Sequence, residues 1–261
     1  MSNVLIVSGH PRTGDDSVAN KTILEELTSL LPAVKIDHLD ELYPDYVFDV
    51  EAEQNKLAAA DVIVLQYPLW WYGWPSLLQK WMEDVFVRGF SHGSTGTALR
   101  GKKLVVSLTT GAAESYYDAQ PGGIERFLAA VKATSALTGL EYAGVLPLYG
   151  VSYANRTDEA ARADMVERSR LHAKRLAEFL DWLMGKGAQA DLPGEGRTFR
   201  RRTSEFWSIW PIAPYTGEVF DVVFLDGLWV GRDAVVLMAC TKEHVVAWHL
   251  AQSECAEAWA A

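Results

Sequence analysis

Short apolar runs alternate with amphipathic segments along the first 184 residues of the chain. The runs are rich in β-branched residues and predict five strands buried on both faces, over 4–7, 34–39, 61–67, 103–109 and 142–148. Apolar positions spaced near 3.6 residues predict five helices, from Ser17 onward and over 52–60, 76–86, 124–137 and 158–184. Regular alternation of strands and helices predicts an α/β fold with a doubly wound, five-stranded parallel sheet.

The pattern changes after residue 184. Residues 185–202 are rich in Gly, Pro and polar side chains and predict a linker. Beyond it come three strand candidates with no helix between them, at 219–227, 234–241 and 244–252. We therefore expect an α/β domain over 1–184, a linker, and a small β-rich appendage over 203–261.

Charge and cysteine content narrow the class of protein. The chain of 261 residues has 34 acidic against 24 basic side chains, a formal net charge of −10. Nucleic acids and anionic membranes need a cationic surface, so we expect neither as a general partner. Two cysteines near the end, Cys240 and Cys255, argue against a disulfide framework. With no basic leader and no unbroken apolar span, the protein is predicted to be cytoplasmic.

A doubly wound sheet binds its ligand beyond the carboxyl ends of its strands, which singles out three loops. The first, at 10–20, carries His10, hydroxyls at Thr13 and Ser17, and a helix N-terminus. These groups suit a phosphate. Because the loop lacks both G-x-x-x-x-G-K-[ST] and G-x-G-x-x-G, a phosphomonoester fits better than a nucleoside triphosphate or a dinucleotide. The alternative is that Ser17 only caps its helix and His10 only turns the chain.

The second loop, PLWWYGWP at 68–75, holds four large aromatic side chains. Such rings stack on a planar cofactor or fill a subunit interface. The alternative is a dimer patch without a ligand.

In the third loop, at 110–123, Gly111 and Ala112 allow close approach of the backbone, whose N–H groups could stabilise a developing anion. Tyr116 and Tyr117 offer phenolic donors. The alternative is a mobile loop whose tyrosines only pack.

Together the loops match flavin mononucleotide, which has a phosphate, a polar ribityl chain and a planar ring that gains negative charge on reduction. No Ser/His/Asp set and no metal-binding cluster is visible in the sequence. A flavin would therefore supply the chemistry.

The strings SGHPRTGDDSVANK, QYPLWWYGWPSLLQKWMEDVFVRGF and GTALRGKKLVVSLTTGAAESYY resemble those of the flavodoxin-like NAD(P)H:quinone oxidoreductases. Over residues 1–182 the chain most resembles the bacterial branch that serves as ancillary subunits of glutathione-gated potassium efflux systems. The resemblance implies a flavoprotein with FMN, or FAD as the alternative. It also implies a homodimer that oxidises NAD(P)H and reduces quinones by ping-pong hydride transfer.

The resemblance also implies a set of site residues. The flavin phosphate would meet His10, Ser17, Val18, Ala19 and Asn20. The ring would lie against Pro68, Leu69, Trp70, Trp71, Thr109, Thr110, Gly111 and Ala112.

Two positions depart from the family pattern. Tyr117 matches a catalytic tyrosine of the mammalian-type enzymes, but the position expected for the histidine that acts with it holds Gly123. Relatives often have a second glycine in place of Ala112, so the space beside the ring is expected to be tighter here.

A different class of function stays open. The protein could be a regulatory subunit that binds a membrane potassium efflux protein, at the inner face of the membrane, and uses the flavin fold as a scaffold. The sequence does not separate NADH from NADPH.

Residues 203–261, which contain TSEFWSIWPIAPYTGEVFDVVFLDGLWVGRDAVVLMACTKEHVVAWHLAQSE, resemble the start of the catalytic domain of DDE transposases of insertion sequences. Asp226 matches the first metal-binding aspartate of that class, at the end of a strand. The other carboxylates that a two-metal reaction needs are missing, so we expect a truncated, inactive fragment and regard a nucleic-acid enzyme as the least favoured function. The alternative is a plain hairpin turn at Asp226–Gly227.

Overall fold

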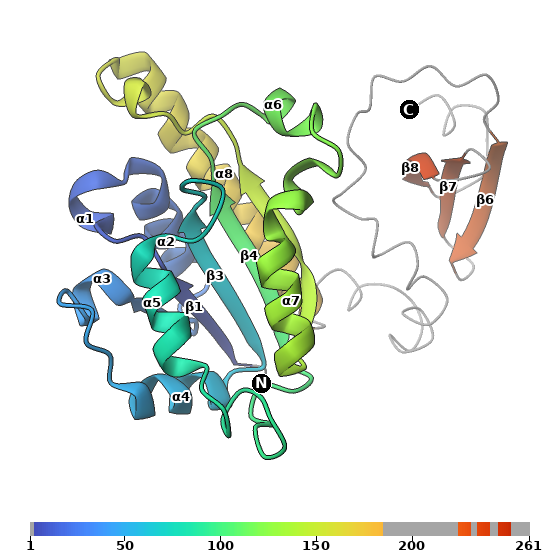
Figure 1. The fold of residues 1–261 in the computed structure, drawn as a ribbon. Helices are drawn as coiled ribbons and strands as arrows, with labels where there is room; N and C mark the ends of the chain where they lie inside the picture. Colours follow the sequence, from blue (N-terminus) through green and yellow to red (C-terminus); the bar gives the residue numbers. More distant parts are fainter. Residues whose placement is uncertain (1–2, 185–223, 231–233, 241–244, 252–261) are drawn as a thin grey trace. The chain divides into compact units, whose positions relative to one another are not determined.

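A computed structural model describes residues 3–184 and the backbone of three strands at 224–230, 234–240 and 245–251 (Figure 1). The chain divides into two compact units, Met1–Met184 and Gly185–Ala261. The predicted linker at 185–202 lies outside the described residues, as does most of 203–261.

The first unit contains a five-stranded sheet in which every pair of neighbours is parallel, in the order β2-β1-β3-β4-β5. This confirms the predicted fold class. Each predicted strand is present with its ends within one residue, since the strands are β1 (Val4–Ser8), β2 (Lys35–His38), β3 (Val62–Pro68), β4 (Lys103–Thr109) and β5 (Glu141–Leu148).

Four of the predicted helices are present with small shifts at their ends. They are α2 (Val18–Leu30), α4 (Val50–Ala59), α5 (Ser76–Val85) and α8 (Glu159–Leu183). The prediction missed short helices in which the 3.6-residue period has no room to repeat. These are α1 (Thr13–Asp16), α3 (Leu39–Leu42), α6 (Glu114–Asp118) and the 3-10 helix η2 (Tyr153–Arg156).

The single helix predicted over 124–137 is confirmed only for its second part. The segment folds as a 3-10 helix, η1 (Gly123–Leu128), followed by α7 (Ala129–Thr138). Leu128, the last residue of η1, has φ −104° and ψ 14°, outside the α region, so the hydrogen-bond pattern changes there. Gly122 and Gly123 precede the break with φ of +83° and +56°.

Helices cover both faces of the sheet (Figure 1). Alternate residues along each strand point to opposite faces. On one face Ile6, Val64 and Val105 form a core with side chains of α2 and α8. On the other, Val7 and Leu65 belong to a core that includes side chains of α3, α4, α5 and α7. Burial on both faces is confirmed for the three central strands β1, β3 and β4, whereas the edge strands β2 and β5 are mostly half-buried because each has a neighbour on one side only.

The second unit contains a three-stranded antiparallel sheet in the order β6-β7-β8, made of β6 (Phe224–Val230), β7 (Ala234–Cys240) and β8 (Val245–Ala251). The hairpin turn proposed at Asp226–Gly227 is wrong, because both residues lie inside β6, paired with Met238 and Leu237. The pairing of β6 with β7 continues to Val230. Asp226 is therefore within the strand and not at its end.

Candidate functional site

The sheet order brings the three predicted loops together at one edge. β1, β3 and β4 are adjacent, and each loop leaves the carboxyl end of one of these strands. The N–H of Leu69 donates to the carbonyl of Thr109 at 2.8 Å, which joins the second loop to the end of β4. The rings of His10 and Trp70 meet edge to face with centroids 5.1 Å apart, which joins the first loop to the second.

Ser17 closes the N-terminus of α2. Its Oγ accepts a hydrogen bond from the N–H of Asn20 at 3.1 Å, which confirms that Ser17 caps α2. Ser17, Ala19 and Asn20 are buried and Val18 is half-buried. α1 precedes this turn, and the N–H of Thr13 donates to Asp40 on α3, which fastens the loop to the neighbouring element.

Polar side chains continue from the helix N-terminus onto the sheet. Asn20 Nδ2 donates to Ser17 Oγ at 2.9 Å and to Thr109 Oγ1 at 3.1 Å. Asn20 Oδ1 accepts from Gln66 Nε2 at 2.8 Å. All four side chains are buried. The sequence analysis did not consider Gln66 as a functional residue. A polar side chain inside an otherwise apolar, fully buried strand was the available signal.

The second loop makes a strained turn that presents aromatic side chains. The N–H of Gly73 donates to the carbonyl of Trp70 at 3.0 Å, and the two residues between them, Trp71 and Tyr72, have φ of +50° and +63°. Two positive φ values at the centre define a type I′ turn, which Gly and Asn normally occupy. Trp71 is 96% exposed, whereas Pro68 and Leu69 are buried.

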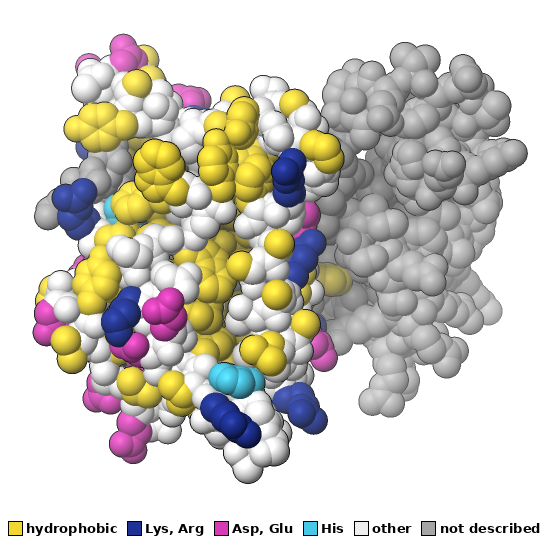
Figure 2. Space-filling model, in the orientation of Figure 1, with side chains coloured by type: hydrophobic (Ala, Val, Ile, Leu, Met, Phe, Trp, Pro, Cys, Tyr) yellow, Lys and Arg dark blue, Asp and Glu magenta, His cyan; other side chains and the backbone are white. Residues whose placement is uncertain are grey.

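Aromatic residues from the second and third loops meet across the site. The hydroxyls of Tyr72 and Tyr116 lie 2.9 Å apart, and the rings of Tyr72 and Phe127 stack with centroids 5.1 Å apart. Trp70, Trp71, Tyr72 and Tyr116 are all exposed. Figure 2 shows apolar side chains gathered at this end of the unit, above the carboxyl ends of β3 and β4 as Figure 1 draws them.

Backbone hydrogen bonds anchor the third loop to the segment after β5. The N–H groups of Thr110, Gly150 and Val151 donate to the carbonyls of Leu148, Ala112 and Thr110. Within the described part of the chain, nothing accepts from the N–H groups of Gly111 and Ala112. A Cβ added to Gly111 would meet only one carbonyl oxygen, 3.9 Å away, so packing within the protein does not demand glycine there.

Tyr117, on α6 within this loop, is 3% exposed, and its ring is perpendicular to those of Tyr116 and Phe127. Burial raises the pKa of the Tyr117 phenol, and a hydrogen bond with the Thr110 side chain opposes the rise. The phenol therefore stays protonated at neutral pH and can act as a donor. Gly123 has a positive φ, a conformation that would strain a histidine at this position.

Most of the α/β unit matches the sequence pattern of a known protein family. The model described as "Flavodoxin-like fold" matches residues 2–173. The chain belongs to this family. The match covers all five strands of the parallel sheet and the three loops described above.

Two proteins with established names are similar to this chain in sequence. The glutathione-regulated potassium-efflux system ancillary protein KefF of Enterobacter sp. (strain 638) is 39% identical over 140 residues, which are 53% of this chain and 78% of the relative. General stress protein 14 of Bacillus subtilis (strain 168) is 38% identical over 182 residues, 68% of this chain and 96% of the relative.

Solved structures show the same fold. General stress protein 14 of Treponema denticola, in complex with FMN, is 26% identical with a TM-score of 0.59 and covers 70% of this chain and 99% of its own. An NADPH-quinone reductase from P. pentosaceus is 25% identical with a TM-score of 0.51, covering 66% and 98%. A protein described as a tryptophan halogenase is 35% identical with a TM-score of 0.56, covering 64% and 96%. Proteins that share this fold therefore have several different functional names.

The residues of this flavodoxin-like chain fit an FMN molecule. The N-terminus of α2 and the Ser17 hydroxyl suit its phosphate. The exposed Trp70 beside His10 suits a planar ring, and the N–H groups of Gly111 and Ala112 suit a ring edge that gains negative charge. The donors are neutral, which matches a phosphomonoester better than a polyphosphate.

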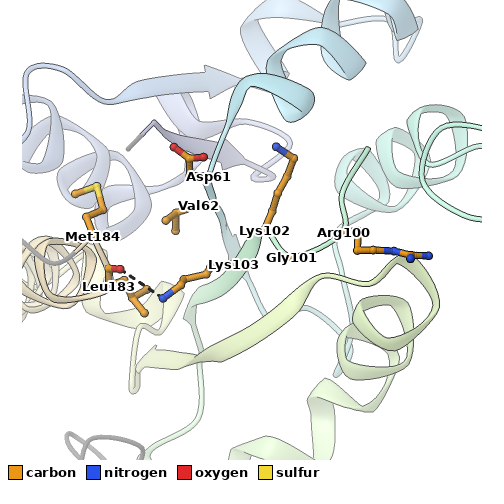
Figure 3. Close-up of a pocket in the computed structure, with 8 residues that line it drawn as sticks. All are labelled: Asp61, Val62, Arg100, Gly101, Lys102, Lys103, Leu183 and Met184. Atoms are coloured by element: carbon orange, nitrogen blue, oxygen red, sulfur yellow. Dashed lines mark hydrogen bonds between the residues drawn. The ribbon is translucent and has the colours of Figure 1, made fainter. Parts of the chain in front are cut away.

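A cavity elsewhere in the unit does not have this chemistry. A pocket of about 550 Å³ opens at the amino ends of β3 and β4 (Figure 3). Its lysines are engaged with helix ends, because Lys102 Nζ donates to the carbonyls of Ala58 and Ala60 and Lys103 Nζ donates to that of Leu183. These lysines stabilise the C-terminal ends of α4 and α8.

Two further observations concern membranes and metals. No helix in the described residues combines the length and apolar character that a membrane span requires. Within the same residues no cluster of three or more His, Cys, Asp or Glu side chains is arranged to hold a metal ion.

Proposed function

We propose that this protein is an FMN-dependent oxidoreductase that takes electrons from NAD(P)H and reduces quinones. The observation that carries the proposal is the convergence of the three loops around unengaged donors, in a chain of the flavodoxin-like family. A solved relative is in complex with FMN and another is named an NADPH-quinone reductase, which supports both the cofactor and the substrate class. FAD remains the alternative flavin, with no adenine pocket identified.

The residues of the first and second loops would bind and orient the cofactor. The N–H groups that begin α2 and the hydroxyl of Ser17 would hold the phosphate, with His10 beside it. Trp70 would lie against the ring, above Pro68 and Leu69, and would exclude water from one side. When bound, FMN supplies two-electron chemistry by accepting a hydride and delivering electrons to an acceptor.

The third loop would stabilise charge and supply a proton. The N–H groups of Gly111 and Ala112 would face the part of the ring that becomes negative on reduction. The hydrogen bonds of Thr110 and of the Ala112 carbonyl to the segment at the end of β5 would hold this backbone in place. Tyr117 would donate its hydroxyl proton toward the acceptor oxygen, because burial keeps that phenol neutral. NAD(P)H and quinone would use the same slot in turn, as ping-pong transfer requires.

Purification of the full chain tests the proposal. The protein should be yellow, or become yellow on soaking with excess FMN, and denaturation should release a chromophore with the mass of FMN. The loaded protein should oxidise NADH or NADPH with a soluble quinone, and the ratio of the two rates identifies the preferred nucleotide. Protein that stays colourless after soaking contradicts the assignment.

A second candidate function is regulatory, and the 39% identity to KefF favours it. The chain would then bind a membrane potassium efflux protein and use the flavin site as a sensor or scaffold. Turnover of NAD(P)H with quinone in the absence of any partner separates the two, since a regulator without chemistry shows none. Co-purification with an efflux protein would support the second function without excluding the first.

We also propose that two copies assemble through the aromatic surface beside the site. Trp71 is 96% exposed in the single chain, and Tyr72 and Tyr116 lie next to the same opening. Large exposed aromatic residues of this kind are typical of interfaces. Sedimentation of the wild-type chain and of Trp71→Ala tests this: a dimer that the substitution weakens is expected, and a wild-type monomer contradicts it.

A further inference from the structure

Gln66 is a fully buried polar residue in the central strand β3, and the proposed function gives it no role. It is 0% exposed and is the register partner of Ser8 on β1 and of Ser107 on β4. Its Nε2 donates to Asn20 Oδ1 at 2.8 Å. Its Oε1 has no partner among the described residues. A buried polar group that is only half satisfied costs stability, so this residue requires an explanation.

The hydrogen bond from Gln66 fixes the orientation of the Asn20 side chain. With Oδ1 facing Gln66, both protons of the Asn20 amide point the other way, to the oxygens of Ser17 and Thr109 at 2.9 and 3.1 Å. Each hydroxyl thus accepts from Asn20, and its own proton must point elsewhere. Neither hydroxyl donates to an acceptor in the described part of the chain.

We propose that Gln66 is a positioning residue that acts through Asn20 to keep the hydroxyls of Ser17 and Thr109 as donors toward the cofactor. This inference rests on the proposed flavin site, and it adds a residue that would act on the cofactor only through Asn20. Rotation of the Asn20 amide by 180° would turn its oxygen toward both hydroxyls. Their protons would then point inward, and their lone pairs would face the bound anion.

The consequence is specific to the charged end of the ligand. A phosphate accepts hydrogen bonds only, so the direction of the Ser17 proton determines whether that hydroxyl attracts or repels it. Riboflavin has the same ring and ribityl chain without the phosphate. The ratio of the riboflavin and FMN dissociation constants therefore isolates the contribution of the phosphate contacts from general effects on the fold.

The test compares this ratio in the full-length wild type and in Gln66→Met, which removes the amide donor at similar volume. The ratio should fall by about tenfold, a typical effect of losing one hydrogen bond to a charged group. Gln79→Met is the matched control, because Gln79 is exposed on α5 and pairs only with Glu83; it should leave the ratio unchanged. Flavin fluorescence measures both constants, and circular dichroism checks folding.

A double substitution decides whether the effect passes through the hydroxyl. Ser17→Ala alone should lower the ratio, and Gln66→Met added to it should lower it no further, because the hydroxyl that Gln66 orients toward the phosphate is gone. The Thr109 hydroxyl, which is expected beside the ring, acts on FMN and riboflavin alike and does not change the ratio. Gln66→Leu repeats the test if the Met variant does not fold.

An unchanged ratio in the Gln66 variant, or a further fall in the double variant equal to that of Gln66→Met alone, overturns the proposal. Failure of the wild type to bind FMN is a different result. It overturns the proposed function itself.

Discussion

At the scale of single residues, the reaction is expected to depend on one buried phenol. Tyr117→Phe removes the proton donor but keeps the ring that packs on Phe127. We expect kcat for quinone reduction to fall by about a hundredfold, which is at the lower end of the rate effect of losing a general acid. The FMN dissociation constant should stay unchanged. Because the pKa of this phenol is raised, its loss of a proton should not limit activity near neutral pH.

Tyr116→Phe is the matched control for this substitution. Tyr116 is 41% exposed and its hydroxyl meets Tyr72, so its loss should change kcat little. Equal losses in both variants would show that the tyrosines act through packing. Stopped-flow measurement of quinone reduction by the pre-reduced protein distinguishes these outcomes.

His172 controls how stability depends on acid. It is 4% exposed on α8, its Nε2 lies 2.7 Å from Ser107 Oγ, and burial lowers the pKa of its imidazole from 6.5 to about 4. Between those values the unfolded chain binds a proton that the folded chain does not, so stability falls as the pH drops from 6.5 to 4. The loss is about 3 kcal/mol for a shift of this size.

His172→Gln should remove this part of the acid dependence, as urea denaturation at pH 7 and pH 4.5 would show. Ser107→Ala should retain it, because burial and not the serine is the main cause of the shift. An acid dependence that is the same in the wild type and in His172→Gln contradicts the assignment.

At the scale of elements, the turn between β3 and α5 stores strain beside the site. Trp71 has a positive φ and almost no contact with the rest of the chain, since it is 96% exposed. Trp71→Asn places a residue that tolerates this conformation. The free energy of unfolding of the flavin-free monomer should therefore rise by about 1 kcal/mol. Binding of FMN or assembly of the dimer should weaken at the same time.

Trp71→Phe is the control, because it keeps both the aromatic ring and the strained backbone. Its stability should match that of the wild type. A loss of stability in Trp71→Asn would mean that the tryptophan packs against the protein in solution.

At the scale of the whole molecule, the α/β unit should function alone. Met1–Met184 forms a compact unit whose two apolar cores lie on either side of its own sheet. A chain that ends after Pro193 should keep the melting temperature of this unit, FMN affinity and NAD(P)H oxidation. Calorimetry and a flavin titration check this, and the loss of both binding and activity would show that the second unit is required.

The strands were predicted well because the apolar run of each strand indicates a strand without reference to the rest of the chain. A run such as 103–109 is mostly apolar, with four of its seven residues Leu or Val, and burial on both faces suits such a run best. The helix boundary at Leu128 was not predicted, because a change from 3-10 to α geometry leaves the apolar pattern intact. Asp226 and Gly227 were assigned to a turn from their residue types, but strand pairing with β7 overrides that local preference.

The sequence by itself determined the alternation of strands and helices and the three loops at the carboxyl ends of the strands. Both follow from hydrophobic periods within a few turns of chain. Only the tertiary structure decided that Gln66 reaches Asn20 and that Asn20 reaches Thr109. These partners lie 46 and 89 residues apart, and their contact depends on the order in which the strands associate. Local patterns do not encode that order, because it results from packing the whole sheet between its two layers of helices.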